Sequence, residues 1–155
     1  MTGTAKIRIE TGKPREKSGK LRVKGGGDGV DVVTRSRIAA RAADDKKGDD
    51  ILVLDVAQIM GIVESFVITS ASNTRMVRSI VDEIEHQLSE QTGDKPRAVE
   101  GLRDASWVLL DYGDLVVHVF LRETREYYAL ERLWADAATV EWAEDATVDK
   151  VTSVS

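Results

Sequence analysis

The clearest pattern in the chain lies between Trp107 and Phe120, where two apolar runs flank the polar sequence Asp111-Tyr-Gly-Asp114. Asp hydrogen-bonds to its own backbone and Gly tolerates positive φ, so the four residues favour a tight turn between two strands. Both strands are apolar on both faces, whereas most hairpins turn one polar face to water. We expect helices to cover one face. A chain this short has little left to cover the other, so the second face is predicted to be a docking surface.

The apolar pattern predicts three more strands around this hairpin. Near-continuous apolar character at 51–56 and 66–70 is typical of strands that are buried on both faces. A short strand is predicted at 97–100. A strand, a long helix and another strand imply a right-handed crossover, to which the hairpin adds an antiparallel element. The sequence therefore predicts the α/β class, with a small mixed sheet packed with helices.

Three helices are predicted. The strongest periodicity begins at a cap, Ser72 or Asn73, and ends near residue 91, before Gly93. A shorter helix is expected at 37–47, capped by Thr34 or Ser36. The last helix is expected at 123–134, with an apolar stripe formed by Tyr127, Leu130, Leu133 and Trp134.

A length of 155 residues fits one domain, and the distribution of charge marks an extension at each end. Residues 1–35 hold nine Lys and Arg against four Asp and Glu, and are predicted to be a flexible basic arm. The domain is expected at 36–135, followed by an acidic, disordered tail at 136–155. From residue 36 onward, thirteen basic residues stand against twenty-three acidic ones, which suits docking on a basic protein rather than on nucleic acid.

The absence of certain residue types sets further expectations. The chain has no cysteine and no apolar run of membrane-spanning length, so we expect a cytoplasmic protein with no membrane partner. The Lys and Arg of the arm have the charge for a weak contact with rRNA phosphates.

Several short motifs, in this order and at these spacings, resemble the ribosomal silencing factor (Iojap) family. They are Asp50-Ile-Leu-Val-Leu-Asp-Val56, Phe66-Val-Ile-Thr-Ser70, Glu100-Gly101, Trp107, Asp111-Tyr-Gly-Asp114, Val117-His-Val119 and Tyr127-Tyr-Ala-Leu-Glu-Arg-Leu-Trp134.

The resemblance implies a single nucleotidyltransferase-like domain that is not an enzyme and needs no cofactor. It implies binding to the large ribosomal subunit through large-subunit ribosomal protein fourteen. The bound protein would block joining of the small subunit and so repress translation under nutrient limitation. The family also includes dimers, so a homodimer is a second expected partner.

The predicted docking surface combines the hairpin with two residues at its rim. Trp and Tyr are frequent hot-spot residues, and carboxylates favour encounter with a basic partner. The predicted contacts are Trp107, Leu109, Leu110, Asp111, Tyr112 and Asp114, with Glu100 and Arg75 at the rim.

Nucleotide binding or a residual nucleotidyltransferase activity is the alternative. Asp111, Asp114 and His118 are residue types that bind divalent cations, and the Ser70–Arg75 loop stands at a helix N-terminus that favours phosphate. The simpler interpretation is preferred for each: turn chemistry for the Asp residues, a core position for His118 and capping for the loop. No catalytic residue and no metal ligand are therefore assigned.

Overall fold

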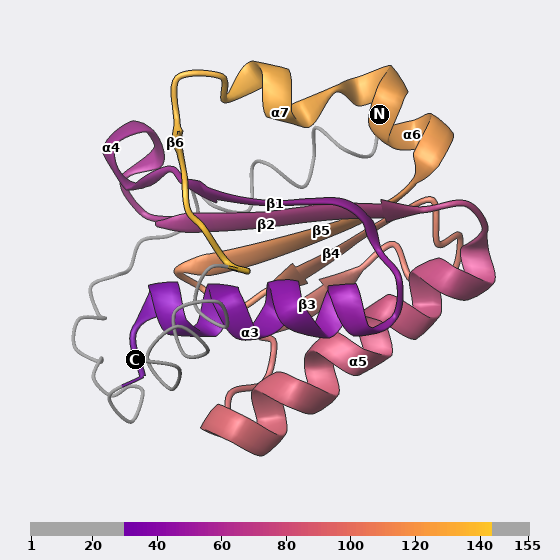
Figure 1. Ribbon diagram of the computed structural model, residues 1–155, viewed down its shortest axis with the longest axis horizontal. Coiled ribbons are helices and arrows are strands. Elements are labelled where there is room, and N and C mark those ends of the chain that lie inside the picture. The colour runs from indigo at the N-terminus through magenta and orange to yellow at the C-terminus, as the bar shows by residue number, and fades with distance from the viewer. Residues whose placement is uncertain (1–29, 144–155) are drawn as a thin grey trace, which may run out of the picture.

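The computed structural model describes residues 30–143, which fold around a six-stranded sheet in the order β3-β4-β5-β2-β1-β6 (Figure 1). The strands are β1 (Asp49–Asp55), β2 (Ser65–Ala71), β3 (Ala98–Glu100), β4 (Trp107–Asp111), β5 (Leu115–Leu121) and β6 (Ala138–Thr139). The helices are α3 (Val32–Asp45), α4 (Ala57–Met60), α5 (Thr74–Thr92), α6 (Arg122–Tyr128) and α7 (Leu130–Leu133). Neighbouring strands are antiparallel except β2 and β5, which pair in parallel. The predicted α/β class with a mixed sheet is confirmed.

The hairpin and the longest helix form where the sequence predicts them. β4 and β5 pair in register from Trp107 with Phe120 to Asp111 with Val116. Asn73 caps α5, since its side-chain oxygen accepts a hydrogen bond from the Met76 N–H at 2.9 Å, and Gly93 ends the helix with φ of 79°.

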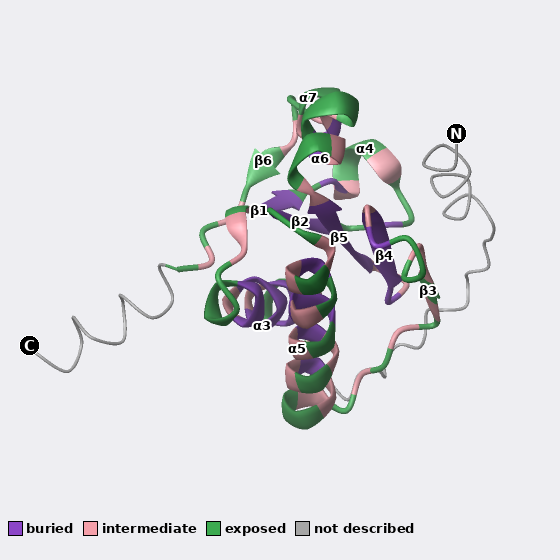
Figure 2. Ribbon diagram, turned by 90° about the vertical axis from the view of Figure 1, so that its right-hand side faces the viewer, coloured by how far each residue is buried: buried purple, intermediate pink, exposed green. Residues whose placement is uncertain are grey.

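Two helical layers enclose the sheet (Figure 1). Helices α3 and α5 cover one face, over a core that includes Val108, Leu110, Val117 and Val119. The other face carries Phe66, Trp107, Leu109 and Phe120, packed against Leu130 and the partly buried Met60 and Trp134. The helices α4, α6 and α7 therefore cover this second face, and the expectation that the chain has little left to cover it is wrong. Figure 2 shows the buried strands between the two layers.

The last predicted helix is broken in two. Ala129 adopts φ of 47° and ψ of 51°, a left-handed conformation that ends α6 before α7 begins. Because the helix is interrupted here, only part of the expected apolar stripe faces the core, and Trp134 packs against it. Leu130 is buried, but Tyr127 and Leu133 are exposed.

The predicted domain boundaries also need correction. Helix α3 begins at Val32, because the Asp31 side chain accepts a hydrogen bond from the Thr34 N–H at 2.9 Å and caps the helix earlier than expected. Strand β6 lies beyond residue 135 and pairs with β1. Residues 1–29 and 144–155, which hold most of the predicted arm and tail, lie outside the described part. Between residues 30 and 143 no helix is long and apolar enough to cross a membrane.

Candidate functional site

Five of the predicted contact residues are buried within the chain. Their exposed fractions are 8% for Trp107, 4% for Leu109, 0% for Leu110, 5% for Asp111 and 6% for Tyr112. Leu110 and Tyr112 face α3 and α5, whereas Trp107 and Leu109 face the opposite layer. The hairpin strands therefore offer little surface of their own to a partner.

The three remaining predicted contacts do not form one surface. Asp114 lies at the hairpin turn, next to the start of β2, because its carbonyl oxygen accepts hydrogen bonds from the backbone N–H groups of Glu64 and Ser65. Arg75 lies in the first turn of α5, beyond the opposite end of β2. Glu100 is half-buried on the edge strand β3, opposite Leu109.

Trp107 is the centre of an aromatic cluster beneath α6. Its indole N–H donates to Nδ1 of His118 over 3.1 Å, and its ring lies 4.8 Å from Phe120 and 5.0 Å from Tyr128, measured between centroids. Tyr127 makes an edge contact with Tyr128 at 4.9 Å and is 80% exposed. The cluster thus connects the buried Trp107 to the surface of the outer layer, and Trp107 supports this surface from below.

The hairpin turn has the predicted hydrogen bond from Gly113 to Asp111, and an ion pair with α3 also holds it in place. The Asp111 carboxylate accepts a hydrogen bond from the Gly113 N–H at 2.8 Å, and Gly113 has φ of 94°. Arg35 of α3 donates to Asp114 over 2.6 Å and to Asp94 over 3.0 Å. Burial lowers the pKa of Arg35, but the hydrogen bond to Asp114 and the charges of both carboxylates outweigh it and raise the pKa overall.

Arg35 was predicted only as one of the basic residues of the flexible arm. Its two acidic partners are 59 and 79 residues away in the sequence, so no local pattern joins them to it. The position of Arg35 on the buried side of an amphipathic helix is the one signal that indicates a specific partner.

The residues of the alternative hypothesis already have partners within the chain. Asp111 caps the turn, Asp114 pairs with Arg35, and His118 lies in the aromatic cluster. Asn73 caps α5, and Arg125 of α6 donates to the Ser70 hydroxyl at 3.2 Å. Within residues 30–143 no three His, Asp or Glu side chains are arranged to hold a metal ion.

A surface that the sequence analysis missed lies on the outside of α4, α6 and α7. Five large apolar side chains are exposed on these helices and in the turn after α4, and we call them the outer apolar patch: Ile59 (45%), Ile62 (46%), Tyr127 (80%), Tyr128 (37%) and Leu133 (66%). Tyr127 and Leu133 were predicted to face the core, and the break at Ala129 could not be read from their spacing. The exposed apolar side chains over this sheet face thus belong to the covering helices and the turn after α4, and not to the strands.

Comparisons with known proteins agree with this architecture. Residues 31–154 match the family described as "Ribosomal silencing factor during starvation". The "Ribosomal silencing factor RsfS" of Bacillus subtilis is 44% identical over 101 residues, covering 65% of this chain and 85% of that protein. The mouse "Mitochondrial assembly of ribosomal large subunit protein 1" is 37% identical over 89 residues, covering 55% of this chain and 38% of the mouse protein.

A solved structure has a similar fold. The crystal structure of protein CV0518 from Chromobacterium violaceum superposes with a TM-score of 0.66 at 32% identity, covering 68% of this chain and 88% of that one. The match over residues 31–154 takes in nearly all of the described domain, including the hairpin and the helices that cover it. The chain therefore belongs to the ribosomal silencing factor family.

Proposed function

We propose that this protein binds the large ribosomal subunit through large-subunit ribosomal protein fourteen and blocks joining of the small subunit. Translation would then fall when nutrients are limiting. The mechanism is steric, so it requires no catalytic residue and no cofactor. The observation that carries the proposal is the family match over residues 31–154. The name of the mouse relative, which refers to the large ribosomal subunit, supports the choice of subunit.

The outer apolar patch is the proposed contact surface. Exposed aromatic and aliphatic side chains gathered on one side of a protein commonly mark a partner site. Glu100 lies on the same face of the sheet as Leu109, and we propose it again as a rim contact. Trp107 contributes by supporting Tyr128, and Asp114 and Arg75 stay predictions.

Charge supports a basic protein as the partner. Residues 30–143 contain thirteen Lys and Arg against twenty-one Asp and Glu. An acidic surface accelerates encounter with a basic protein and repels the phosphates of exposed RNA. The proposed rRNA contact of the N-terminal arm concerns residues outside the described part.

Co-sedimentation with separated large and small ribosomal subunits tests the proposal. We expect the protein to pellet with the large subunit alone, and the yield of joined ribosomes to fall as protein is added. Association with neither subunit, or equal association with both, would contradict the proposal. In that case calorimetry with magnesium and nucleoside triphosphates would test the alternative.

The outer apolar patch is also available to a second copy of the chain. We propose that a homodimer formed through it excludes ribosome binding, because one surface cannot contact two partners at once. Sedimentation velocity at rising concentration, with and without the purified ribosomal protein, should show the dimer giving way to a one-to-one complex. A complex that contains two copies per ribosomal protein would contradict mutual exclusion.

A further inference from the structure

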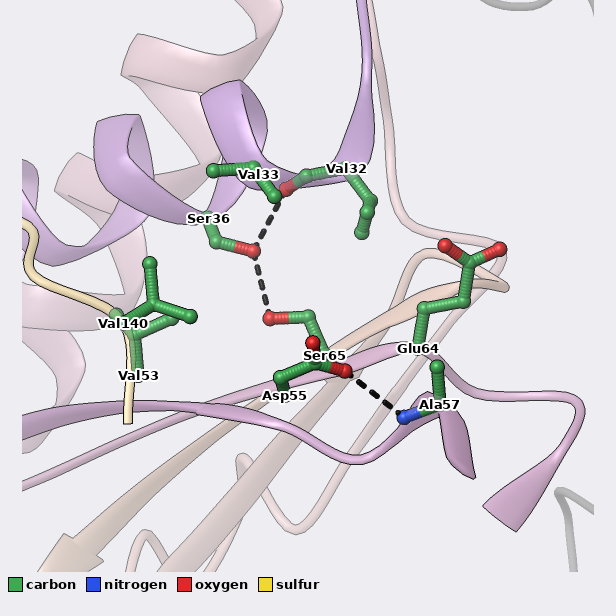
Figure 3. A pocket seen from close by; sticks show the side chains of 9 residues that line it. All are labelled: Val32, Val33, Ser36, Val53, Asp55, Ala57, Glu64, Ser65 and Val140. Atoms are coloured by element: carbon green, nitrogen blue, oxygen red, sulfur yellow. Dashed lines mark hydrogen bonds between the residues drawn. The ribbon is translucent and has the colours of Figure 1, made fainter. Parts of the chain in front are cut away.

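A small cavity lies between the N-terminal turn of α3 and the adjoining ends of β1 and β2 (Figure 3). Its volume is about 120 Å³, well below the roughly 300–1,000 Å³ of typical small-molecule sites. The space suits a single side chain better than a nucleotide. The lining residues are Val32, Val33, Ser36, Val53, Asp55, Ala57, Glu64, Ser65 and Val140.

The walls of this cavity are apolar and its hydroxyl groups are already paired. Ser36 donates a hydrogen bond to the Val32 carbonyl at 2.7 Å, and its oxygen lies 2.7 Å from that of Ser65. Four valines make up much of the remaining wall, so the cavity fits the methylene groups of a long side chain.

Two carboxylates are among the lining residues. Asp55 accepts a hydrogen bond from the Ala57 N–H at 3.1 Å, which leaves its second oxygen available. Within residues 30–143 the Glu64 carboxylate has no hydrogen bond or ion pair. Burial raises the pKa of Glu64, repulsion from Asp114 and Asp55 raises it further, and attraction to Arg35 only partly offsets these effects. A cation at this position would relieve the repulsion.

We propose that this cavity binds one lysine or arginine side chain of the protein partner, with its methylene stem against the valines and its charge between Asp55 and Glu64. The inference rests on the proposed function, because it takes the basic ribosomal protein as the occupant. Charge complementarity supports this choice. So does position, since Ala57 is the first residue of α4 and lines the cavity, while Ile59 of the same helix belongs to the outer apolar patch. The cavity lies on the α3 side of the sheet, so a partner on the patch would reach it around the end of the sheet, at Ala57.

The first test uses short peptides and does not depend on the ribosome. Acetyl-Gly-Lys-Gly-amide is titrated into the full-length protein while the methyl signals of Val32, Val53 and Val140 are followed by NMR. The control peptide carries norleucine, which has a similar stem and no charge. We expect the lysine peptide to shift these signals and the norleucine peptide to shift them about fivefold less, because the stem alone lacks the charge-assisted contact. Absent shifts, or equal shifts with both peptides, would overturn the proposal.

The second test asks whether the ribosomal partner uses the cavity. The double variant Asp55→Asn and Glu64→Gln keeps the shapes of both side chains and the acceptor for Ala57. We expect it to bind the large subunit about tenfold more weakly at low salt. The matched control, Asp82→Asn with Glu90→Gln, removes the same charge from exposed positions on α5, across the sheet from α4. It should change binding less than about twofold.

The outcomes separate the two proposals. Wild-type binding that the double variant retains in full would overturn the cavity proposal and leave the proposed function standing. Peptide-induced shifts without any binding of wild-type protein to large subunits would overturn the partner and, with it, the proposed function. Peptide-induced shifts that appear only after Lys20, Arg22 and Lys24 are changed to Gln would also overturn the cavity proposal, because the chain's own N-terminal segment would then be the occupant.

Discussion

Gly101 occupies a position in which a side chain meets two obstacles. Its φ is 85°, and a Cβ built on it would lie 2.1 Å from the carbonyl oxygen of Trp107. We predict that Gly101→Ala lowers the free energy of unfolding by about 3 kcal/mol or more, since backbone strain and a clash with backbone atoms combine. Urea denaturation measures the change.

Gly93 provides the matched control for this prediction. It also has a positive φ, of 79°, but a Cβ there would meet nothing within 4 Å. Gly93→Ala should therefore cost only the strain of the left-handed conformation, about 1–2 kcal/mol. Equal losses of unfolding free energy in the two variants would show that the backbone near Trp107 shifts at no cost to make room for the added methyl group.

Glu64 should make stability depend on pH in a defined direction. Its pKa is raised above the ordinary value of 4.5, by burial first and by Asp114 next, so the folded chain binds more protons than the unfolded chain between the two values. The free energy of unfolding contributed by Glu64 therefore falls as pH rises through this window. We predict that Glu64→Gln stabilises the protein at neutral pH by about 0.5 kcal/mol or less, because the desolvation of Glu64 is only partial and the water that still contacts this exposed residue screens its charge.

The difference in the free energy of unfolding between wild type and Glu64→Gln should depend on pH, and measuring this dependence tests the prediction. Near pH 3 or so, below both pKa values, wild type and Glu64→Gln should have about the same stability, because Glu64 is then neutral in both states. Thermal denaturation at several pH values provides the comparison. A larger advantage of the variant in acid than at neutral pH would contradict the assigned direction.

Individual contacts were the least predictable part of the candidate site. The hydrogen bond from Gly113 to Asp111 follows from local turn chemistry, and it is present. Whether Trp107 is buried or exposed depends on elements that the local sequence does not specify. The same is true of the ion pairs of Arg35, whose partners come from distant segments.

Among the elements, α6 and α7 depend on one buried cation. Arg125 is only 7% exposed, and it contacts the Asp49 carbonyl, the Ser70 hydroxyl and Glu131 at 3.2 Å each. These contacts attach the broken helix to the ends of β1 and β2. We predict that Arg125→Met lowers the free energy of unfolding by about 2 kcal/mol, because it leaves buried acceptors without a donor. Hydrogen exchange should accelerate in α6 and α7 more than in α5.

Arg122 on the same helix is the control for Arg125. It pairs with Asp49, but 53% of its side chain is exposed. Arg122→Met should leave the free energy of unfolding almost unchanged, since exposed ion pairs contribute little. Similar effects of the two variants would contradict the role given to burial.

Element prediction succeeded where a local signal fixes both ends. Asn73 and Gly93 bound α5, and the Asp-rich turn fixes the hairpin register. It failed at the last helix, because a spacing of three and four residues does not reveal a left-handed residue such as Ala129. It also failed for the cover of the second sheet face, because the four-residue helix α4 is too short to produce a periodic pattern.

At the scale of the whole molecule, the outer apolar patch predicts that the protein binds the large ribosomal subunit through one side. Changing Tyr127 and Leu133 together to Ser should weaken large-subunit binding by about tenfold or more, since exposed aromatic and leucine anchors carry much of such interfaces. Both side chains are largely exposed, so the fold should be retained. Co-sedimentation, with circular dichroism to check folding, measures the effect.

Leu102 serves as the control for this surface. It is 41% exposed and belongs to the loop after β3, not to the three outer helices. Leu102→Ser should leave large-subunit binding within about twofold of wild type. A stronger effect at Leu102 than at the Tyr127 and Leu133 pair would relocate the docking surface to the β3 edge.

The parallel pairing of β2 with β5 has a consequence for how the chain is made. Ser65–Ala71 pairs with Leu115–Leu121, on the order of fifty residues later in the sequence. While the protein is being synthesised, the inner edge of β2 stays unpaired until those later residues have left the exit tunnel. At roughly 5–20 residues per second this interval lasts a few seconds. During that time the nascent chain exposes an apolar strand edge that chaperones or other nascent chains can bind.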